Sequence, residues 1–431
     1  MQRMAVSRRG LLGSFGALGG VAFLPRMAWG SAAAEAKFPT VVRMLDGYVS
    51  TGKLPGMIAA MGWGAADAPM DIARGTVARG LDQAVDMDSL FRIYSMTKPI
   101  TGMAAMMLVD EGKLRLDQPI ADLLPAFGKM MVQTTPDGSI TDLRPAKAQI
   151  TVRHLMTHTA GLGYSIIQNG PIKDAFIKAG VVPGQASRLP MPGMDGFKPL
   201  SSLAEFADVL ATLPLVYEPG SVWSYSVGLD LLGRVIEVAS GKAFDAFLVE
   251  RVFGPCGMTS TWFRVPQSEA GRLTTNYAAV SGMLLPVDPG KTSIYLDQPP
   301  YPFGGAGLVS SPRDYDRFQR MLLGFGKIDG RQVMSEAAVR LGTSNLLPVG
   351  TDLSKAFIKG NGFGAGGSVG LGEDAGTYGW AGAAGTVGFV NFRVGLRAGC
   401  YTQYMPSEAY PVHREFAQAV LADVTGKKAA A

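Results

Sequence analysis

Residues 91–114, FRIYSMTKPITGMAAMMLVDEGKL, place a serine and a lysine at the head of an apolar segment of helical length. The apolar residues at helical spacing are Ile100, Met103, Ala104, Met107 and Leu108. This spacing predicts a helix over about residues 96–112. Because positions i and i+3 share a helix face, Ser95 and Lys98 would lie side by side at its start.

The Ser-x-x-Lys pattern is weak by itself. A serine before a helix is most often its N-cap, and a lysine three residues later is most often solvated. The pattern also occurs at Ser50 and Lys53, but there it falls in a Gly/Pro turn that would not hold the pair together. The helix start at Ser95 is therefore the stronger candidate of the two.

The chemistry of a serine nucleophile explains why the helix start matters. A hydroxyl becomes a good nucleophile when a neighbouring base takes its proton. A lysine can be that base where burial or another cation lowers its pKa. The backbone N–H groups of a helix N-terminus also favour a developing oxyanion. Ser95 and Lys98 are thus a candidate nucleophile and base.

The remaining patterns predict an α+β architecture. The first elements expected are a helix over 38–50 and a strand near 56–63. The stretch from about 115 to 250 is mainly helical, and the part from 163 to 200 is expected to be a loop over a site. Gly-separated strand-like runs follow residue 300, before a last helix over 407–425. This order predicts one α+β unit with an inserted, mainly helical subdomain.

The N-terminus has the features of an export signal. Arg8 and Arg9 precede a Gly-rich apolar stretch and then small residues suited to cleavage within 30–36. This predicts a twin-arginine signal over 1–34 and export to the periplasm, with an ordinary Sec signal or a basic membrane-surface helix as the alternatives. Residues 35–431 would form the folded domain, its α/β part at about 35–90 and 250–425 and its helical part at about 110–250.

Charge and apolar content limit the expected partners. The formal net charge of +5 comes largely from four arginines within residues 1–34, which contain no acidic residue. No basic stripe with interleaved aromatics remains, so we expect no nucleic-acid binding. No run approaches the roughly 20 apolar residues of a membrane helix, so we expect no stable membrane insertion. Cys256 and Cys400 are expected to be free and buried, with a disulfide as the alternative.

Four segments, in this order, resemble the serine β-lactamase-like hydrolases. They are SMTKPITGMAAMMLVDEGKLRLDQPIADLLP, ITVRHLMTHTAGL, YEPGSVWSYSVGLDLLGRVIE and YGWAGAAGTVGF. That superfamily includes class C β-lactamases, DD-peptidases and family VIII carboxylesterases, and the resemblance spans about residues 38–423. It implies a β-lactamase/DD-peptidase-like fold, an antiparallel sheet flanked by helices with a mainly helical insertion.

The resemblance also implies roles for single residues. Ser95 would be the acylated nucleophile and Lys98 its proton partner. Tyr225, in WSYSVG, matches the family's Tyr-x-Asn position, where the phenol passes protons between serine, lysine and leaving group. The N–H groups of Ser95 and Ala383 would form the oxyanion hole. Without the resemblance, Tyr225 could equally be an aromatic residue of the core.

The departures from the family pattern concern substrate recognition. Trp380, Ala381 and Gly382 match the Lys-Thr-Gly strand, so Trp380 stands where relatives have a cation that holds a substrate carboxylate. Val227 stands where they have an asparagine that bonds a substrate amide. Trp380, Gly382 and Val227 would therefore border an apolar substrate site suited to an uncharged ester, although Trp380 could instead be packing of an edge strand.

Two Gly-rich patterns and a histidine pair are weaker signals. Ser368 lies in GGSVG, Gly366–Gly370. The nucleophile elbow of α/β-hydrolases requires a helix directly after the serine, and no helix is expected here. GFGAGG, over 362–367, lacks the helix and acidic residue of a dinucleotide site. His154 and His158 lack the glutamate of a zinc-protease motif, and we expect them to be structural. We expect no metal and no cofactor.

Together these patterns predict a serine carboxylesterase that acts on a small-molecule ester through an acyl-enzyme on Ser95. A transesterase, a D-amino-acid amidase or peptidase and a weak β-lactamase remain alternatives, because water access to the acyl-enzyme decides the acceptor. A non-catalytic cell-wall-binding relative is less favoured, because Ser95, Lys98 and Tyr225 are all present.

Overall fold

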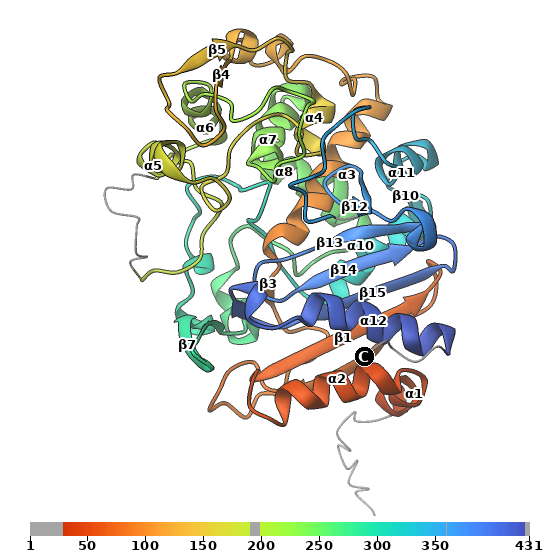
Figure 1. The fold of residues 1–431 in the computed structure, drawn as a ribbon. Helices are drawn as coiled ribbons and strands as arrows, with labels where there is room; N and C mark the ends of the chain where they lie inside the picture. Colours follow the sequence, from red (N-terminus) through yellow and green to blue (C-terminus); the bar gives the residue numbers. More distant parts are fainter. Residues whose placement is uncertain (1–28, 190–198, 359, 427–431) are drawn as a thin grey trace, which may run out of the picture.

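The protein, in a computed structural model, is described over residues 29–189, 199–358 and 360–426. Its main sheet has seven strands in the order β11-β12-β13-β14-β15-β1-β2, each antiparallel to its neighbours (Figure 1). Their bounds are β1 Gly56–Trp63, β2 Met70–Gly75, β11 Gly362–Phe363, β12 Ser368–Val369, β13 Thr377–Ala381, β14 Val387–Asn391 and β15 Leu396–Tyr401. The strand predicted near 56–63 is confirmed.

Strand β1 joins the beginning and the end of the described chain in one sheet. It pairs with β15, with Ile58 opposite Tyr401. Met57, Ala59 and Met61 face one core, and the intervening Ile58 and Ala60 face the other. Because successive side chains of a strand point to opposite faces, a strand buried on both faces needs an uninterrupted apolar sequence. The run GMIAAMGW of β1 provides it.

Helices cover both faces of the sheet. α2 (Pro39–Val49) and the C-terminal α12 (Val412–Thr425) pack side by side on one face (Figure 1), and α10 (Pro312–Leu323) packs on the other. The predicted first and last helices are therefore confirmed, although residues 407–409 form a separate 3-10 turn before α12. Helix α1 (Trp29–Lys37) precedes α2. The predicted export signal falls largely on residues 1–28, which lie outside the described residues, and it stays a prediction. The predicted cleavage region, 30–36, lies within α1, and cleavage there also stays a prediction.

The middle of the chain forms a mainly helical part above the sheet in Figure 1. Its helices are α4 Val152–Met156, α5 Gly170–Lys178, α6 Leu203–Leu210, α7 Gly228–Ser240 and α8 Phe244–Leu248. The stretch 163–200, predicted to be a loop, contains α5, and that prediction is corrected here. Proline follows the first residue of α5, and Ile172 and Phe176, one turn apart, are buried. This short apolar pair is too weak a pattern to predict a helix by itself.

Smaller elements complete the fold. The helices are α9 Gly254–Cys256 and α11 Glu336–Gly342, and the strands are β3 Phe91–Arg92, β4 Met131–Gln133, β5 Leu143–Pro145, β6 Asn276–Val280, β7 Met283–Asp288, β8 Val309–Ser310, β9 Lys327–Ile328, β10 Arg331–Gln332 and β16 Tyr404–Met405. β6 and β7 form a hairpin, and β16 adds to β6 in parallel. No described helix has the length and apolar content needed to cross a bilayer.

Helix α3 (Thr97–Asp110) lies at the junction of the helical part and the sheet. Its residues from Thr97 to Leu108 are all buried, and it contacts α7, α11 and β13. The Gly-rich segment before β12 crosses it closely: a Cβ on Gly102 would lie 2.1 Å from the Ala365 carbonyl oxygen, and one on Gly366 would lie 2.2 Å from the Lys98 carbonyl oxygen. Gly366 of GFGAGG and Gly102 of α3 thus allow the segment to cross the helix.

This crossing predicts an unusual cost for a glycine-to-alanine change in a helix. Gly102→Ala should lower the free energy of unfolding by about 2 kcal/mol, because overpacking outweighs the better helix propensity of alanine. Gly47→Ala in α2 is the matched control, since its Cβ would meet nothing within 4 Å. It should raise the free energy of unfolding by about 0.5–1 kcal/mol. Urea denaturation measures both, and equal effects would contradict the close crossing.

Candidate active site

Ser95 lies in a 3-10 turn, Tyr94–Met96, that leads directly into α3. Tyr94, just before it, has a φ of 40°, a left-handed conformation that is costly for a bulky residue. Two groups hold Tyr94 in place: its ring packs edge-on against Tyr295, and its phenol oxygen accepts a hydrogen bond from the Asn276 amide. The turn therefore fixes the serine at the head of the helix, where a part of it reaches solvent.

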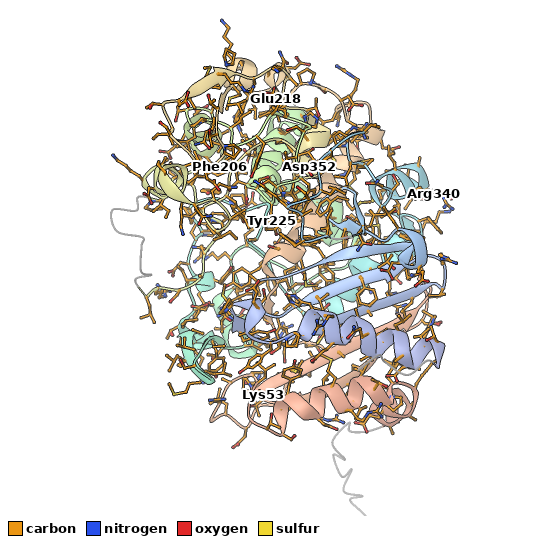
Figure 2. The ribbon with its side chains drawn as sticks, in the orientation of Figure 1. Lys53, Phe206, Glu218, Tyr225, Arg340 and Asp352 are labelled. Carbon is orange, nitrogen blue, oxygen red and sulfur yellow. The ribbon has the colours of Figure 1, made fainter. Side chains whose placement is uncertain are left out.

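The structure brings Ser95, Lys98 and Tyr225 together. The Tyr225 phenol donates to the Ser95 Oγ at 2.8 Å, and the Lys98 Nζ donates to the same oxygen at 3.1 Å. Tyr225 lies just before α7, at the place where the helical part meets the sheet (Figure 2). Three groups that exchange protons thus share one oxygen. Their predicted catalytic roles stay predictions.

The ammonium of Lys98 is fully buried. Its Nζ donates to the Gly305 carbonyl at 2.7 Å, in addition to Ser95. It lies 4.5 Å from the centroid of the Tyr225 ring and 5.8 Å from that of the Tyr164 ring, within the range of cation–π attraction. A buried cation is costly unless it is paired and hydrogen-bonded, and these contacts offset that cost.

The end of β13 borders the turn that carries Ser95. Trp380 Nε1 donates to the Tyr225 phenol oxygen at 3.2 Å. A Cβ on Gly382 would lie 2.4 Å from the Ile93 carbonyl oxygen, so the two segments touch through their backbones. Ala383 is half-buried and packs with Tyr94. The predicted pairing of the Ser95 and Ala383 N–H groups is consistent with this contact and stays a prediction.

Aromatic rings surround Tyr225. Trp223, Phe357 and Trp380 lie within 6.2 Å of it between ring centroids. Phe357 is 58% exposed and also packs against Trp380, whereas Trp223 is fully buried. Aromatic rings therefore cover the Tyr225 ring on its exposed side, whereas the Lys98 ammonium and the His158 ring lie against it in the interior.

Other predicted residues lie away from Ser95 or inside the core. Val227 is fully buried next to the start of α7, and its backbone N–H donates to the Gly163 carbonyl. Its predicted contact with a substrate stays a prediction. Ser368 is in β12, with no helix directly after it. The cysteines Cys256 and Cys400 are buried and unpaired, and burial raises the pKa of each thiol to about 12.

The two histidines have structural partners. His154 closes a capping box with Thr151 at the start of α4, and burial lowers its pKa to about 4. His158 is fully buried beneath the Tyr225 ring, and its Nδ1 accepts the backbone N–H of Ser226 at 3.2 Å. Burial and the charge of Lys98 lower the pKa of His158 well below its ordinary value. In the described residues, no group of three His, Cys, Asp or Glu side chains is placed to hold a metal ion.

Sequence reasoning missed three residues of the site. Tyr164 comes from the stretch predicted to be a loop, and Gly305 comes from the turn before β8. Asp230, in the first turn of α7, is fully buried and accepts the Gly305 N–H at 2.8 Å. Its signal was an acidic residue among the apolar residues of GLDLLGRVIE, five positions after Tyr225. Burial raises the pKa of Asp230 to about 6, although the charge of Lys98 opposes this.

Comparison with known proteins identifies the family. The Beta-lactamase family model matches residues 45–423. The chain belongs to the Beta-lactamase family. The resemblance to the serine β-lactamase-like hydrolases seen in the sequence is therefore confirmed.

Members of this family with related sequences include esterases. Protein Rv1367c of Mycobacterium tuberculosis (strain H37Rv) is 38% identical over 328 residues, which are 72% of this chain and 76% of that protein. Esterase EstB of Burkholderia gladioli is 31% identical over 258 residues, 56% of this chain and 59% of EstB.

Solved structures show the same fold. EstCE1, described as a hydrolase with promiscuous acyltransferase activity, superimposes with a TM-score of 0.71 at 25% identity, covering 90% of this chain and 100% of EstCE1. The unliganded simvastatin synthase LovD of Aspergillus terreus superimposes with a TM-score of 0.71 at 21% identity. The superposition covers 93% of this chain and 100% of LovD, and at this identity it shows a shared fold and nothing more. The predicted α+β, β-lactamase/DD-peptidase-like fold is confirmed. The chain is an enzyme of the serine hydrolase and acyltransferase class on this fold.

The hydrogen bond from Trp380 predicts an effect on the reactivity of Ser95. Trp380→Phe keeps a ring beside Tyr225 but removes the N–H donor. We expect labelling of Ser95 by a fluorophosphonate to slow by about three- to tenfold, as for the loss of one neutral hydrogen bond.

Trp223→Phe is the control for this change. Trp223 also packs on the Tyr225 ring, but its Nε1 has no hydrogen-bond partner among the described residues. Trp223→Phe should lower the free energy of unfolding, because the smaller ring leaves a cavity, but it should not slow the labelling of Ser95. Equal slowing of labelling in both variants would show that packing on the Tyr225 ring, and not the hydrogen bond from Trp380, sets the reactivity of Ser95.

Proposed function

We propose that this protein is a serine carboxylesterase that forms an acyl-enzyme on Ser95, with Lys98 and Tyr225 as general base and acid. The observation that carries the proposal is the pair of hydrogen bonds that the phenol and the ammonium both make to the Ser95 Oγ, at 2.8 and 3.1 Å. Both distances lie within the reach needed for proton transfer. The esterase EstB among its relatives supports the choice of ester.

In the reacting form that we propose, the Tyr225–Lys98 pair holds one proton fewer than a neutral phenol beside an ammonium. The Ser95 Oγ attacks the ester carbonyl carbon while its proton passes to the basic group of that pair. The tetrahedral oxyanion accepts hydrogen bonds from the N–H groups of Ser95 and Ala383. When the intermediate collapses, the carbon–oxygen bond to the alcohol breaks and Tyr225 returns the proton to the leaving oxygen. In the second half, water loses its proton to the same pair and attacks the acyl carbon. The bond between that carbon and the Ser95 Oγ then breaks, and the pair returns the proton to Ser95 as the acid is released.

The choice of an uncharged substrate rests on the groups that border Ser95. Trp380 stands in the place of a cation that would attract a carboxylate, and its N–H is already used by Tyr225. Phe357 and Trp380 add apolar surface beside the phenol. A carboxylate placed there would lose its hydration without gaining an ion pair, which is unfavourable. The twin-arginine motif supports the further proposal that the enzyme acts in the periplasm.

Acyl transfer to an alcohol other than water is the second candidate. It uses the same acyl-enzyme, and it is supported by EstCE1 and by the acyltransferase calJ of Penicillium decumbens, which is 29% identical over 234 residues. The two candidates differ only in the group that attacks the acyl carbon. Adding an alcohol to the assay and measuring the transfer product separates them.

Replacing the proposed nucleophile tests the assignment. Ser95→Ala should lower turnover of p-nitrophenyl butyrate by at least about a thousandfold and abolish fluorophosphonate labelling, with an unchanged circular dichroism spectrum. Ser368→Ala, in the Gly-rich GGSVG segment, should retain wild-type turnover. Mass spectrometry of the intact protein should find the acyl group on the Ser95 peptide. Full turnover by Ser95→Ala would exclude the proposal.

A substrate panel tests the preference for esters. We expect kcat/KM for p-nitrophenyl butyrate to exceed that for nitrocefin and for D-alanine amide by at least about a hundredfold, because the site lacks partners for a carboxylate and an amide. The variant Trp380→Lys, which restores the cation of the family pattern, should narrow the gap for nitrocefin. A wild-type preference for nitrocefin would identify the protein as a β-lactamase instead.

A further inference from the structure

The segment Gly304–Gly305 connects the buried ammonium of Lys98 to a buried carboxylate. The Gly305 carbonyl accepts a hydrogen bond from Lys98 Nζ at 2.7 Å, and the Gly305 N–H donates to Asp230 Oδ1 at 2.8 Å. Lys98 and Asp230 form no direct ion pair in the part of the chain that the structure describes. Gly305 therefore lies between the two charges. Its carbonyl points to the positive ammonium, and its N–H points to the negative carboxylate.

Close packing holds this segment against α7. A Cβ on Gly305 would lie 2.6 Å from Asp230 Oδ2, and a Cβ on Gly304 would lie 2.5 Å from the Leu229 carbonyl oxygen. From the other side, the Thr101 hydroxyl donates to the Gly304 carbonyl at 2.7 Å. Two glycines are thus required, and the segment is held by α3 and α7 at once.

Asp230 lies in the first turn of α7, where a negative charge is favourable, but this position does not require the side chain to be buried. Its Oδ2 is buried without a hydrogen-bond partner among the described residues, and its side chain is fully buried. An unpaired buried carboxylate is costly, and an uncharged residue of similar size would avoid that cost. The positive charge of Lys98 acts on this carboxyl and stabilises its ionised form.

We propose that Asp230 is a positioning residue for Lys98: it holds the Gly305 peptide in place, so that the Gly305 carbonyl stays against Lys98 Nζ, and it places a buried negative charge near that amine. The inference rests on the proposed function, in which Lys98 exchanges a proton with Ser95.

Burial raises the pKa of Asp230 itself to about 6, so its own titration also falls within the acid limb, and Asp230→Asn removes it. The other neighbours with a shifted pKa are two phenols and an imidazole. Tyr164 and Tyr301 face Asp230, and burial together with its carboxylate raises the pKa of each phenol well above the ordinary value. His158 faces Lys98 and remains neutral, since burial lowers its pKa. Tyr225, the remaining neighbour of Lys98, belongs to the proton-transfer pair itself.

The test is the pH dependence of kcat/KM for p-nitrophenyl butyrate in Asp230→Asn. Asparagine keeps an oxygen that accepts the Gly305 N–H but removes the charge, so the protonated ammonium loses its stabilisation. We expect the acid limb of the profile to move to lower pH by on the order of one unit. Asp230→Ala, which also releases Gly305, should lower kcat by about tenfold or more with little change in KM.

Thr101→Val is the matched control, because it loosens the same glycine segment without changing any charge. It should lower kcat without moving the acid limb.

An acid limb that coincides in wild type and Asp230→Asn would overturn the inference, even where Ser95→Ala confirms the nucleophile. Turnover that survives Ser95→Ala would instead overturn the proposed function, so the two failures are distinguishable. Circular dichroism of each variant establishes that it is folded, and Asp230→Asn decides the question if Asp230→Ala does not fold.

Discussion

The burial of one ammonium group constrains the whole region where the helices meet the sheet. Lys98 is fully enclosed, so every group around it must either accept a hydrogen bond or present an electron-rich face. The surrounding chain meets this demand with a carbonyl from Gly305, the hydroxyl of Ser95 and the ring of Tyr225. These three groups come from distant parts of the sequence. The cation therefore specifies how α3, α7 and the segment before β8 fit together.

The sheet provides the rigid side of this junction. Because β1 pairs with β15, the first and last parts of the described chain form one layer, with α2 and α12 on one face and α10 on the other. The strand β13 then extends toward Ser95, where Trp380 reaches the Tyr225 phenol and Gly382 touches the backbone before Ser95. The nucleophile thus lies between a helix that carries its proton partner and a strand that orients the phenol.

The elements with strong local patterns were predictable, and those defined by tertiary contacts were not. The apolar spacing of α3, α2 and α12 and the continuous apolar run of β1 gave those elements correctly. The order of the four motifs also anticipated that Ser95 and Tyr225 meet. Helix α5 was not predicted, because Ile172 and Phe176 are the only buried apolar residues that mark its inner face.

Residues of the site that lack a motif were beyond sequence reasoning. Asp230 looks like one acidic residue in an amphipathic helix, and its burial follows only from the packing of the Gly304–Gly305 segment against α7. Likewise, the glycines of GFGAGG suggest a nucleotide loop or a turn, whereas they lie where neighbouring segments leave no room for a Cβ. A Cβ on Gly366 would lie 2.2 Å from the Lys98 carbonyl oxygen of α3, and one on Gly364 would lie 2.5 Å from the Gly342 carbonyl oxygen. Such close approaches between distant segments leave no periodic trace in a sequence.

The left-handed backbone of Tyr94 links the nucleophile to a remote hairpin. Such a conformation stores on the order of 1–3 kcal/mol and persists only because its surroundings enforce it. The enforcing groups are Asn276, at the start of β6, and Tyr295, beyond the end of β7. The backbone that presents the serine is therefore held from outside the group of side chains bonded to Ser95, so a substitution at Asn276 or Tyr295 would release it without touching the nucleophile.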